Sequence, residues 1–282
     1  MKALHHPMTA PPPLELTLIG IGTGNPGHLT RQAEAAMRAA DLILLPHKGQ
    51  DKAELAALRQ ALCHAVLGAD AARACIVGFD MPLRRSEGGD YLNQVDEWHA
   101  AITQRWQAAI AQALARQPAL RQGKAALQVA LLVWGDPALY DSTLRIAARL
   151  RPAPQRVQVV AGITAMQALT AAHALALNDI GQPFLVTTGR QLREHGWPQG
   201  VDTLVVMLDG QCSFEALPAA LAQQLHIWWG AYLGMPQQLL DSGPLPQAGP
   251  RIVQARAAAR AQHGWIMDTY LLRRPSQGRT PG

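Results

Sequence analysis

Cysteine and charged residues are scarce in this sequence, and each shortage argues against a class of site or partner. The 282 residues include three cysteines and no Cys-x-x-Cys pair, which disfavours a disulfide framework and a zinc site. We therefore expect no bound metal and a reducing, cytoplasmic setting. Charged residues make up 16% of the chain, with a net charge of +5 and scattered arginines. This distribution favours a small anionic ligand over nucleic acid, which usually requires a contiguous basic stripe.

Long apolar runs are also lacking. No run approaches the roughly 20 apolar residues of a membrane-spanning helix, and residues 1–13 (MKALHHPMTAPPP) lack the apolar core of a signal peptide. We expect no membrane association, a disordered leader at 1–13 and a disordered tail at 276–282. Apolar residues are instead spread through the chain and make up 49% of it, enough for a sizeable core in one large or two smaller domains.

Residues 127–140 (LQVALLVWGDPALY) combine the pattern of a buried strand with an abrupt stop. The continuous apolar run up to Val133 is typical of a strand buried on both faces of a parallel sheet. Trp134, Gly135 and Asp136 follow at the carboxyl end, where open α/β sheets bind ligands. Gly135 has no Cβ to keep a ligand away, and Asp136 offers a carboxylate. The simpler interpretation is a strand-ending turn with a helix cap.

The beginning of the chain predicts a βαβ unit. An apolar strand at 14–21 leads into a glycine loop at 22–27, a helix at 30–40 and a second strand at 42–45. Such a unit is parallel and right-handed. We therefore predict the α/β fold class.

Strand and helix patterns continue to alternate along the chain. We expect strands at 74–77, 127–133, 157–160, 184–188, 203–208, 225–229 and 265–272, helices at 53–67, 91–115, 142–150, 214–224 and 252–261, and another helix ending at Leu175. The turn at 178–183 and a change in strand style predict an N-terminal domain at 14–163 and a C-terminal domain at 164–275.

The glycine loop permits a different interpretation. Gly22, Gly24 and Gly27 match the Gly-x-Gly-x-x-Gly pattern of dinucleotide-binding folds. Pro26, however, removes an amide that would face a pyrophosphate. No acidic residue ends the second strand to hold a ribose, because residues 45–47 read LPH. An NAD(P)-dependent oxidoreductase is therefore the less favoured alternative.

Several segments, taken together, resemble one family. They are 18–30 (LIGIGTGNPGHLT), 135–137 (GDP), 160–165 (VAGITA), 202–208 (DTLVVML) and 229–232 (WGAY) through 241–243 (DSG). Their order and spacing resemble the tetrapyrrole methylases, the class III S-adenosylmethionine methyltransferases. Thr23, Asn25 and Ala161 stand where the family usually has proline, aspartate and proline.

The resemblance implies the tetrapyrrole methylase fold, with two α/β domains, S-adenosylmethionine in the cleft between them, and a homodimer. Trp134, Gly135 and Asp136 would hold the methionine and ribose end, and Met207 or Leu208 would pack on the adenine. The full set of implied cofactor-binding residues is Thr23, Trp134, Gly135, Asp136, Leu139, Tyr140, Thr164, Ala165, Met207, Leu208, Gly230 and Ala231. The simpler interpretation of Met207 is core packing.

Within the family, one group of members is resembled by residues 21–26 (IGTGNP), 48–59 (KGQDKAELAALR, ending in Leu58-Arg59), the 91–99 helix, 207–210 (MLDG) and 228–234 (WWGAYLG). Members of this group act in aerobic cobalamin biosynthesis, where they methylate precorrin-5 at ring carbon C1 and release acetate. The alternatives are another tetrapyrrole or precorrin methylase, a diphthine synthase of the same family, or a non-catalytic cofactor-binding protein.

Methyl transfer mainly requires alignment of the attacking carbon with the methyl group, whereas acetate release also requires a proton carrier. Candidates for that role are His47, His99, Asp96 and Tyr91. We favour His47 because it follows a strand at the ligand-binding edge, although an acidic residue is expected there from the family. For each candidate, a structural role is the simpler interpretation.

The implied substrate is a flat macrocycle that carries several carboxylates. Basic residues in loops near predicted strand ends are suited to bind carboxylates, and they are Lys48, Lys52, Arg84, Arg85, Arg190 and Arg193. The Arg84–Arg85 loop is our first choice, because Gly88 and Gly89 would let it close. A solvated surface charge is the simpler interpretation of any single one of these residues.

Overall fold

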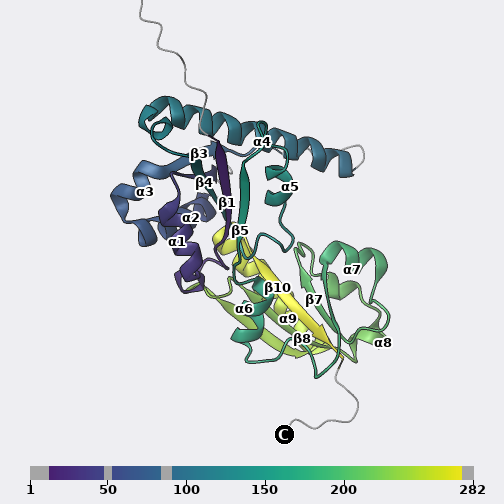
Figure 1. Ribbon diagram of the computed structural model, residues 1–282. Coiled ribbons are helices and arrows are strands. Elements are labelled where there is room, and N and C mark those ends of the chain that lie inside the picture. The colour runs from purple at the N-terminus through teal and green to yellow at the C-terminus, as the bar shows by residue number, and fades with distance from the viewer. Residues whose placement is uncertain (1–12, 48–52, 84–90, 275–282) are drawn as a thin grey trace, which may run out of the picture. The chain divides into compact units, whose positions relative to one another are not determined.

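Figure 1 shows the computed structural model, which describes residues 13–47, 53–83 and 91–274. The leader predicted at the N-terminus, apart from Pro13, and the tail predicted at the C-terminus lie outside the described residues.

Contacts divide the chain into two compact units. Unit 1 comprises Met1–Ile21 and Leu29–Gly162, and unit 2 comprises Gly22–His28 and Ile163–Gly282. The glycine loop, which the sequence analysis assigned to the N-terminal domain, is thus grouped with unit 2 by its contacts.

The described part of unit 1 forms a five-stranded, all-parallel sheet with the order β3-β2-β4-β1-β5. The strands are β1 (Leu14–Gly20), β2 (Leu42–His47), β3 (Ile76–Asp80), β4 (Leu127–Val133) and β5 (Arg156–Val160). The register of β1 with β4 runs from Leu14 opposite Leu127 to Gly20 opposite Val133. Because the strands are parallel, their carboxyl ends share one edge, where the predicted site residues of β2 and β4 lie.

Apolar side chains cover both faces of this sheet. Leu42 and Leu44 of β2 point to one face, and the alternating Ile43 and Leu45 point to the other. The first face packs against α4 (Tyr91–Arg116) and α5 (Thr143–Ala147), and the second packs against α1 (Arg31–Ala39), α2 (Ala53–Leu67) and α3 (Ala69–Cys75) (Figure 1). This two-sided burial is the reason for the continuous apolar strands in the sequence.

Two predicted boundaries in unit 1 are wrong. The strand expected at 74–77 begins at Ile76, because the preceding residues form α3, whose Ala72 packs into the core. The helix expected at 142–150 is α-helical only over Thr143–Ala147. Beyond it the chain tightens, since the amides of Arg149 and Leu150 donate to carbonyls three residues earlier.

The described part of unit 2 forms a mixed five-stranded sheet with the order β6-β7-β10-β8-β9. The strands are β6 (Phe184–Thr188), β7 (Thr203–Met207), β8 (His226–Ala231), β9 (Leu239–Pro244) and β10 (Asp268–Arg273). β6 is parallel to β7, whereas β10 is antiparallel to both β7 and β8, and β8 is antiparallel to β9. The two sheets and their helices confirm the predicted α/β class.

Helices lie on both faces of the second sheet. On one face, Leu169 of α6 (Ala165–Ala172) packs with Leu271 of β10. On the other, Tyr270 meets Phe214 edge to face, with ring centroids 5.2 Å apart, and Phe214 lies beside Gly249 of α9 (Leu245–His263).

Several elements of unit 2 differ from the prediction. The single helix expected at 214–224 is a 3-10 turn, Ser213–Ala216, followed by the short helix α8 (Ala219–Ala222), because Pro218 interrupts the hydrogen-bond pattern. The structure also contains β9 and α7 (Gly189–His195), which the sequence analysis did not predict.

Helix α9 begins at Leu245, although the sequence analysis began it at residue 252. Prolines at 246 and 250 led to that later start, since a proline inside a helix removes one hydrogen bond. Leu245, Ala248 and Gly249 are buried, so packing of the first turns outweighs the loss.

Candidate functional site

Three glycine backbones meet at the carboxyl ends of β1, β4 and β5 in unit 1. A Cβ built on Gly162 would lie 2.1 Å from the Gly135 oxygen and 2.8 Å from the Gly20 Cα, and a Cβ on Gly20 would lie 2.6 Å from the Gly162 nitrogen. Backbone atoms leave no room for a side chain at that distance, so positions 20 and 162 require glycine. Gly135 has a φ of 63°, a left-handed conformation that glycine adopts readily.

Asp136 links the loop after β4 to the loop after β5. Its Oδ2 accepts a hydrogen bond from the Gly162 amide at 2.8 Å, and its Oδ1 accepts one from the Ala138 amide at 2.8 Å. The carboxylate therefore holds two strand-end loops together. Each oxygen retains acceptor capacity, so contact of Asp136 with a cofactor stays a prediction.

Trp134 is half-buried, and its ring lies against Arg59 of α2, which the sequence analysis did not select as a site residue. The Arg59 Cζ is 4.8 Å from the ring centroid, and its Nε donates to the Leu132 carbonyl at 3.3 Å. Burial lowers the pKa of Arg59 to about 10, opposed by the charge of Asp141. Arg59 is thus a buried cation at neutral pH. The sequence does contain an indication of this burial: Arg59 lies three residues before Leu62 and therefore on the core-facing side of the helix.

Leu139 and Tyr140 continue the loop after β4. The Leu139 amide donates to the Asp136 carbonyl at 3.2 Å, and the side chain is half-buried. Tyr140 has a φ of 50° and is 45% exposed, and partial burial raises the pKa of its hydroxyl. Both side chains thus have surface that a ligand can reach.

His47 ends β2 at the same edge of the sheet and is exposed. A Cβ built on Gly78 of β3 would lie 2.1 Å from the His47 Nε2, so the imidazole lies across the space that glycine leaves at that position. The His47 carbonyl accepts a hydrogen bond from the Met81 amide at 2.9 Å. The His47 backbone is therefore held by the Met81 amide, while the His47 ring stays accessible to solvent.

The other candidate proton carriers lie on α4 in different environments. Asp96 is exposed and forms an ion pair with Arg149. His99 is 4% exposed, and its ring centroid is 5.8 Å from that of Trp98. Tyr91 begins α4, but its side chain lies outside the described residues. A substrate in solution can therefore reach Asp96 at the surface, whereas His99 is buried in the interior.

In unit 2, the glycine loop is attached to the loop after β8. The Thr23 hydroxyl donates to the Leu233 carbonyl at 2.5 Å and lies 2.9 Å from the His28 Nδ1. Since the hydroxyl proton is used, we assign the proton to His28 Nδ1, which then donates. Burial lowers the pKa of His28. Gly22, whose φ is 70°, leaves space for His28, because a Cβ there would lie 2.4 Å from the His28 Cβ.

The loop after β7 presents an apolar side chain to solvent. Met207 ends the strand and is half-buried, whereas Leu208 is 68% exposed with a φ of 53°. A leucine in the left-handed region is uncommon. Leu208 is therefore held in a conformation that exposes its side chain, and its contact with a ligand stays a prediction.

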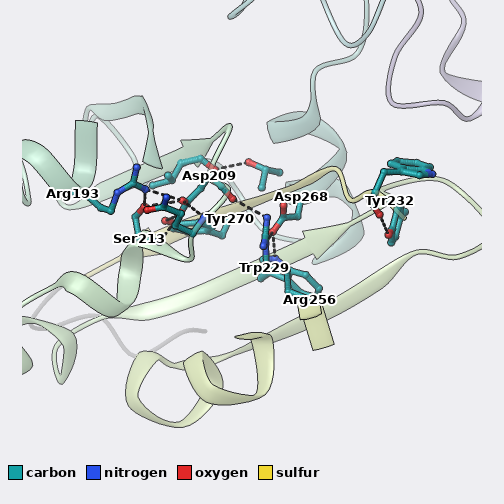
Figure 2. A network of polar contacts seen from close by, with 12 residues as sticks. Arg193, Asp209, Ser213, Trp229, Tyr232, Arg256, Asp268 and Tyr270 are labelled. Carbon is teal, nitrogen blue, oxygen red and sulfur yellow. Dashed lines mark hydrogen bonds and ion pairs between the residues drawn. The ribbon is translucent and has the colours of Figure 1, made fainter. Parts of the chain in front are cut away.

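Asp209 holds this loop through a network shown in Figure 2. Its carboxylate accepts hydrogen bonds from the Ser213 amide at 2.6 Å, the Ser213 hydroxyl at 2.7 Å, the Gln211 amide at 3.1 Å and the Tyr270 hydroxyl at 2.7 Å. Burial opposes ionisation, but the bonds from Tyr270, Ser213 and the backbone amides outweigh it and lower the pKa of Asp209. The sequence analysis used Asp209 as a motif residue without giving it this role.

Thr164 and Ala165 lie at the start of α6. The Thr164 hydroxyl accepts from the Gln167 amide at 3.4 Å, and the Gln167 Oε1 accepts from the Thr164 amide at 2.9 Å, a capping box. Ala165 is half-buried in the first turn. The motif at 160–165 thus has a structural role in starting this helix.

Gly230 and Ala231 are buried in β8. A Cβ on Gly230 would lie 2.5 Å from the Leu233 Cδ2 and 3.0 Å from the Leu169 Cδ1. The space beside Gly230 is therefore filled by leucine side chains, which leaves backbone groups as the means by which this pair can contact a ligand.

The predicted substrate-binding residues are only partly described. Lys48, Lys52, Arg84 and Arg85 lie outside the described residues. Arg190 is exposed on α7. Arg193, on the same helix, donates to the Ser213 hydroxyl at 2.5 Å and lies 3.4 Å from Asp209, so its guanidinium belongs to the network of Figure 2.

Further features bear on metals and membranes. In residues 13–47, 53–83 and 91–274, no helix is both long and apolar enough to cross a membrane. The same ranges contain no group of three or more His, Cys, Asp or Glu side chains placed to hold a metal ion. All three cysteines are free thiols, and burial raises the pKa of Cys63 to about 12 and that of Cys212 to about 11.

Residues 15–249 match the family model of the tetrapyrrole (corrin/porphyrin) methylases. A curated relative, precorrin-6A synthase (deacetylating) from Sinorhizobium sp., is 43% identical over 263 residues, which cover 92% of this chain and 95% of the relative. These matches include segments of both units and favour the methylase over the nicotinamide alternative.

Solved structures have a similar fold. A crystal structure described as a cobalamin synthesis related protein from Corynebacterium diphtheriae matches with a TM-score of 0.71 at 35% identity, over 93% of this chain and 99% of that chain. A uroporphyrin-III C-methyltransferase from Thermus thermophilus matches with a TM-score of 0.55 at 20% identity, over 92% and 94% of the two chains. The second likeness concerns the fold alone.

Proposed function

The chain belongs to the tetrapyrrole (corrin/porphyrin) methylases and is a methyltransferase, and from that premise we propose that it methylates precorrin-5 at ring carbon C1 and releases acetate, forming precorrin-6A. The observation that carries this proposal is the 43% identity to the Sinorhizobium precorrin-6A synthase over 92% of this chain. The proposed reaction is a step of cobalamin biosynthesis.

We propose S-adenosylmethionine as the methyl donor, and the strand-end loops fit it in three respects. Leu208 offers an exposed apolar surface of the kind on which an adenine packs. Gly210 has no atom within 4 Å of a built Cβ, so space is open beside that surface. In unit 1, Gly135 exposes backbone without a side chain in the way.

Other predicted contacts fit less directly. The Thr23 hydroxyl is bonded to the Leu233 carbonyl, and the space beside Gly230 is filled by the Leu233 side chain. We therefore propose that Thr23, Gly230 and Ala231 shape the loops around the donor and offer it backbone groups at most.

When bound, S-adenosylmethionine supplies a sulfonium methyl group for an in-line displacement in which positive charge disappears. The chain's own contribution to that displacement is alignment, which is worth about 7–11 kcal/mol when it is good. Trp134, Gly135 and Asp136 would hold the methionine and ribose end, and Met207 or Leu208 the adenine. Leu139, Tyr140, Thr164 and Ala165 complete the proposed set.

Acetate release requires a group that moves a proton or orients a water molecule, and we propose His47 for this role. Its ring lies at the carboxyl edge of the sheet, is exposed, and makes no hydrogen bond with the described residues. Asp96, by comparison, is paired with Arg149, and His99 is buried. His47 is thus the candidate that a bound substrate can reach most directly.

The test is incubation of the purified full chain with methyl-labelled S-adenosylmethionine and precorrin-5. The proposal expects label in the macrocycle and one acetate released for each methyl transferred. Transfer without acetate would assign the chain to another precorrin methylase, and transfer to the diphthine precursor on a protein would assign it to diphthine synthesis. Absence of transfer to precorrin-5 would contradict the proposal.

We also propose that the chain is a homodimer, as the family resemblance implies. Light scattering on the purified protein should give twice the chain mass of 30.4 kDa. A monomer mass at micromolar concentration would contradict this part of the proposal.

A further inference from the structure

A small cavity in unit 1 lies against the carboxyl ends of β2, β3 and β4. Its volume is about 180 Å³, and its walls are mostly apolar, including Leu44, Phe79, Trp98, Ile102 and Leu131. Cavities that bind whole ligands usually measure roughly 300–1,000 Å³. This cavity is therefore too small for a macrocycle and suits one small group.

The guanidinium of Arg59 lines this cavity with most of its hydrogen-bonding capacity unused. Arg59 is 8% exposed, and its Nε donates to the Leu132 carbonyl. Within residues 13–47, 53–83 and 91–274, its two terminal nitrogens donate no hydrogen bond, and no carboxylate lies within 4.0 Å of them. The Trp134 ring and the Leu132 carbonyl stabilise the cation but carry no negative charge, so the position is suited to an anion.

Trp106 of α4 also lines this cavity and carries a buried donor that is not used. It is 3% exposed, and its Nε1 has no acceptor among the described residues. Buried N–H groups almost always have an acceptor. Arg59 and Trp106 thus line one small space from two different helices, and Ser142 and Thr143 also belong to its wall.

Asp141 also lines the cavity, and its negative charge acts on Arg59. Its Oδ1 accepts a hydrogen bond from the Thr143 amide at 2.6 Å, and it forms no ion pair with Arg59 within 4.0 Å. The charge of Asp141 favours the protonated form of Arg59 and would oppose an incoming anion. Removal of this charge should therefore tighten anion binding rather than weaken it.

We propose that this cavity binds the carboxylate of a short alkyl acid, either a side chain of the tetrapyrrole or the acetate that the reaction releases. The choice of these two sources rests on the proposed function. The Arg59 guanidinium offers a forked pair of donors to a carboxylate, and Trp106 offers another. Phe79 and Ile102 give the methyl or methylene group an apolar surface, which an inorganic oxyanion would not use.

Binding is tested with ¹³C-labelled acetate, followed by NMR line broadening on the full chain at constant ionic strength. The proposal expects saturable binding that Arg59→Gln weakens at least about tenfold, the loss of a charge-assisted pair. Trp106→Phe should weaken binding severalfold, and Asp141→Asn should strengthen it. Arg105→Gln removes an exposed arginine from α4 and is the matched control, with unchanged affinity expected. If Arg59→Gln does not fold, the Trp106 and Asp141 variants decide.

Steady-state kinetics with precorrin-5 separate the two sources. If the cavity holds a substrate side chain, Arg59→Gln raises KM and acetate competes with precorrin-5. If the cavity holds the released acetate, Arg59→Gln leaves KM unchanged and slows the step that splits acetate from the macrocycle. Added acetate then inhibits the reaction without competing with precorrin-5.

Two results would overturn the carboxylate site. One is acetate binding that none of the variants alters. The other is absence of acetate binding together with wild-type KM and kcat in Arg59→Gln. Failure of the proposed function gives a different result. A wild-type chain that binds acetate through Arg59 but transfers no methyl group to precorrin-5 would support the carboxylate site and contradict the proposed reaction.

Discussion

At the scale of single residues, the buried carboxylate of Asp209 couples the fold of unit 2 to pH. Hydrogen bonds from Tyr270, Ser213 and backbone amides hold its pKa below the ordinary value despite burial. The ionised form therefore stabilises the fold fully at pH values above the unfolded-state pKa, about 3.9. This contribution is lost as the pH falls through the lower, folded-state pKa.

Tyr270→Phe removes one of these donors, and we expect it to lower the free energy of unfolding by about 1.5–3 kcal/mol at neutral pH. The difference in the free energy of unfolding from wild type should shrink as the pH falls below about 4, because a protonated carboxyl accepts the Tyr270 hydrogen bond more weakly than a carboxylate does. Urea unfolding of both proteins between pH 3 and 7 measures this difference.

Tyr232→Phe is the matched control for that experiment. The Tyr232 hydroxyl donates to the Trp265 carbonyl at 2.6 Å, an acceptor that does not titrate. The destabilisation that Tyr232→Phe causes should therefore not shrink as the pH falls below about 4, the range in which the Asp209 contribution is lost. A pH-independent loss in Tyr270→Phe as well would refute the role given to Asp209.

His47→Gln tests the proposed proton carrier. Glutamine retains hydrogen-bonding groups but does not carry a proton at neutral pH, so acetate release should slow by about 10²-fold or more. Binding of S-adenosylhomocysteine, measured by calorimetry, should be unchanged. The control is His195→Gln on the exposed part of α7. Equal rates of acetate release in the two variants would remove His47 from the mechanism.

At the scale of elements, the contact between the ends of β1, β4 and β5 depends on glycine. Gly162→Ala would place a Cβ 2.1 Å from the Gly135 oxygen, so the strand ends must separate. We expect a loss of about 1–3 kcal/mol in the free energy of unfolding, as is typical of overpacking. Ala161→Ser, at the exposed neighbouring position, should change it by less than about 0.5 kcal/mol. Urea unfolding that shows equal stability in the two variants would disprove the close contact.

Elements with a strong local pattern were predictable, and those set by packing were not. The buried strands of unit 1 were found because consecutive apolar residues serve both faces of a parallel sheet. Helix α9 was started too late because Pro250 suggests a break, yet buried Leu245 and Ala248 extend the helix across it. The strand β9 was missed because its sequence, LLDSGP, contains residues that are rare in strands. Antiparallel pairing with β8 stabilises the extended conformation that the sequence alone does not favour.

At the scale of the whole molecule, binding of the proposed donor should stabilise the chain. S-adenosylhomocysteine at about 100 times its Kd would add about 2.7 kcal/mol to the free energy of unfolding. We expect its addition to raise the Tm by several degrees, whereas NAD(P) at the same concentration should leave the Tm unchanged. A shift with NAD(P) alone would favour the dinucleotide interpretation of the glycine loop.

The α/β class, the parallel first sheet and the family could be predicted from the amino-acid sequence, because they follow from local periodicity and from the order of short motifs. The contacts of the motif residues became known from the folded structure: Thr23 donates a hydrogen bond to the Leu233 carbonyl, and Asp136 accepts one from the Gly162 amide. It also placed the cation of Arg59 in a small apolar cavity with Trp106. These contacts join residues far apart in the chain, and burial and hydrogen bonding between such residues depend on packing that no local pattern records.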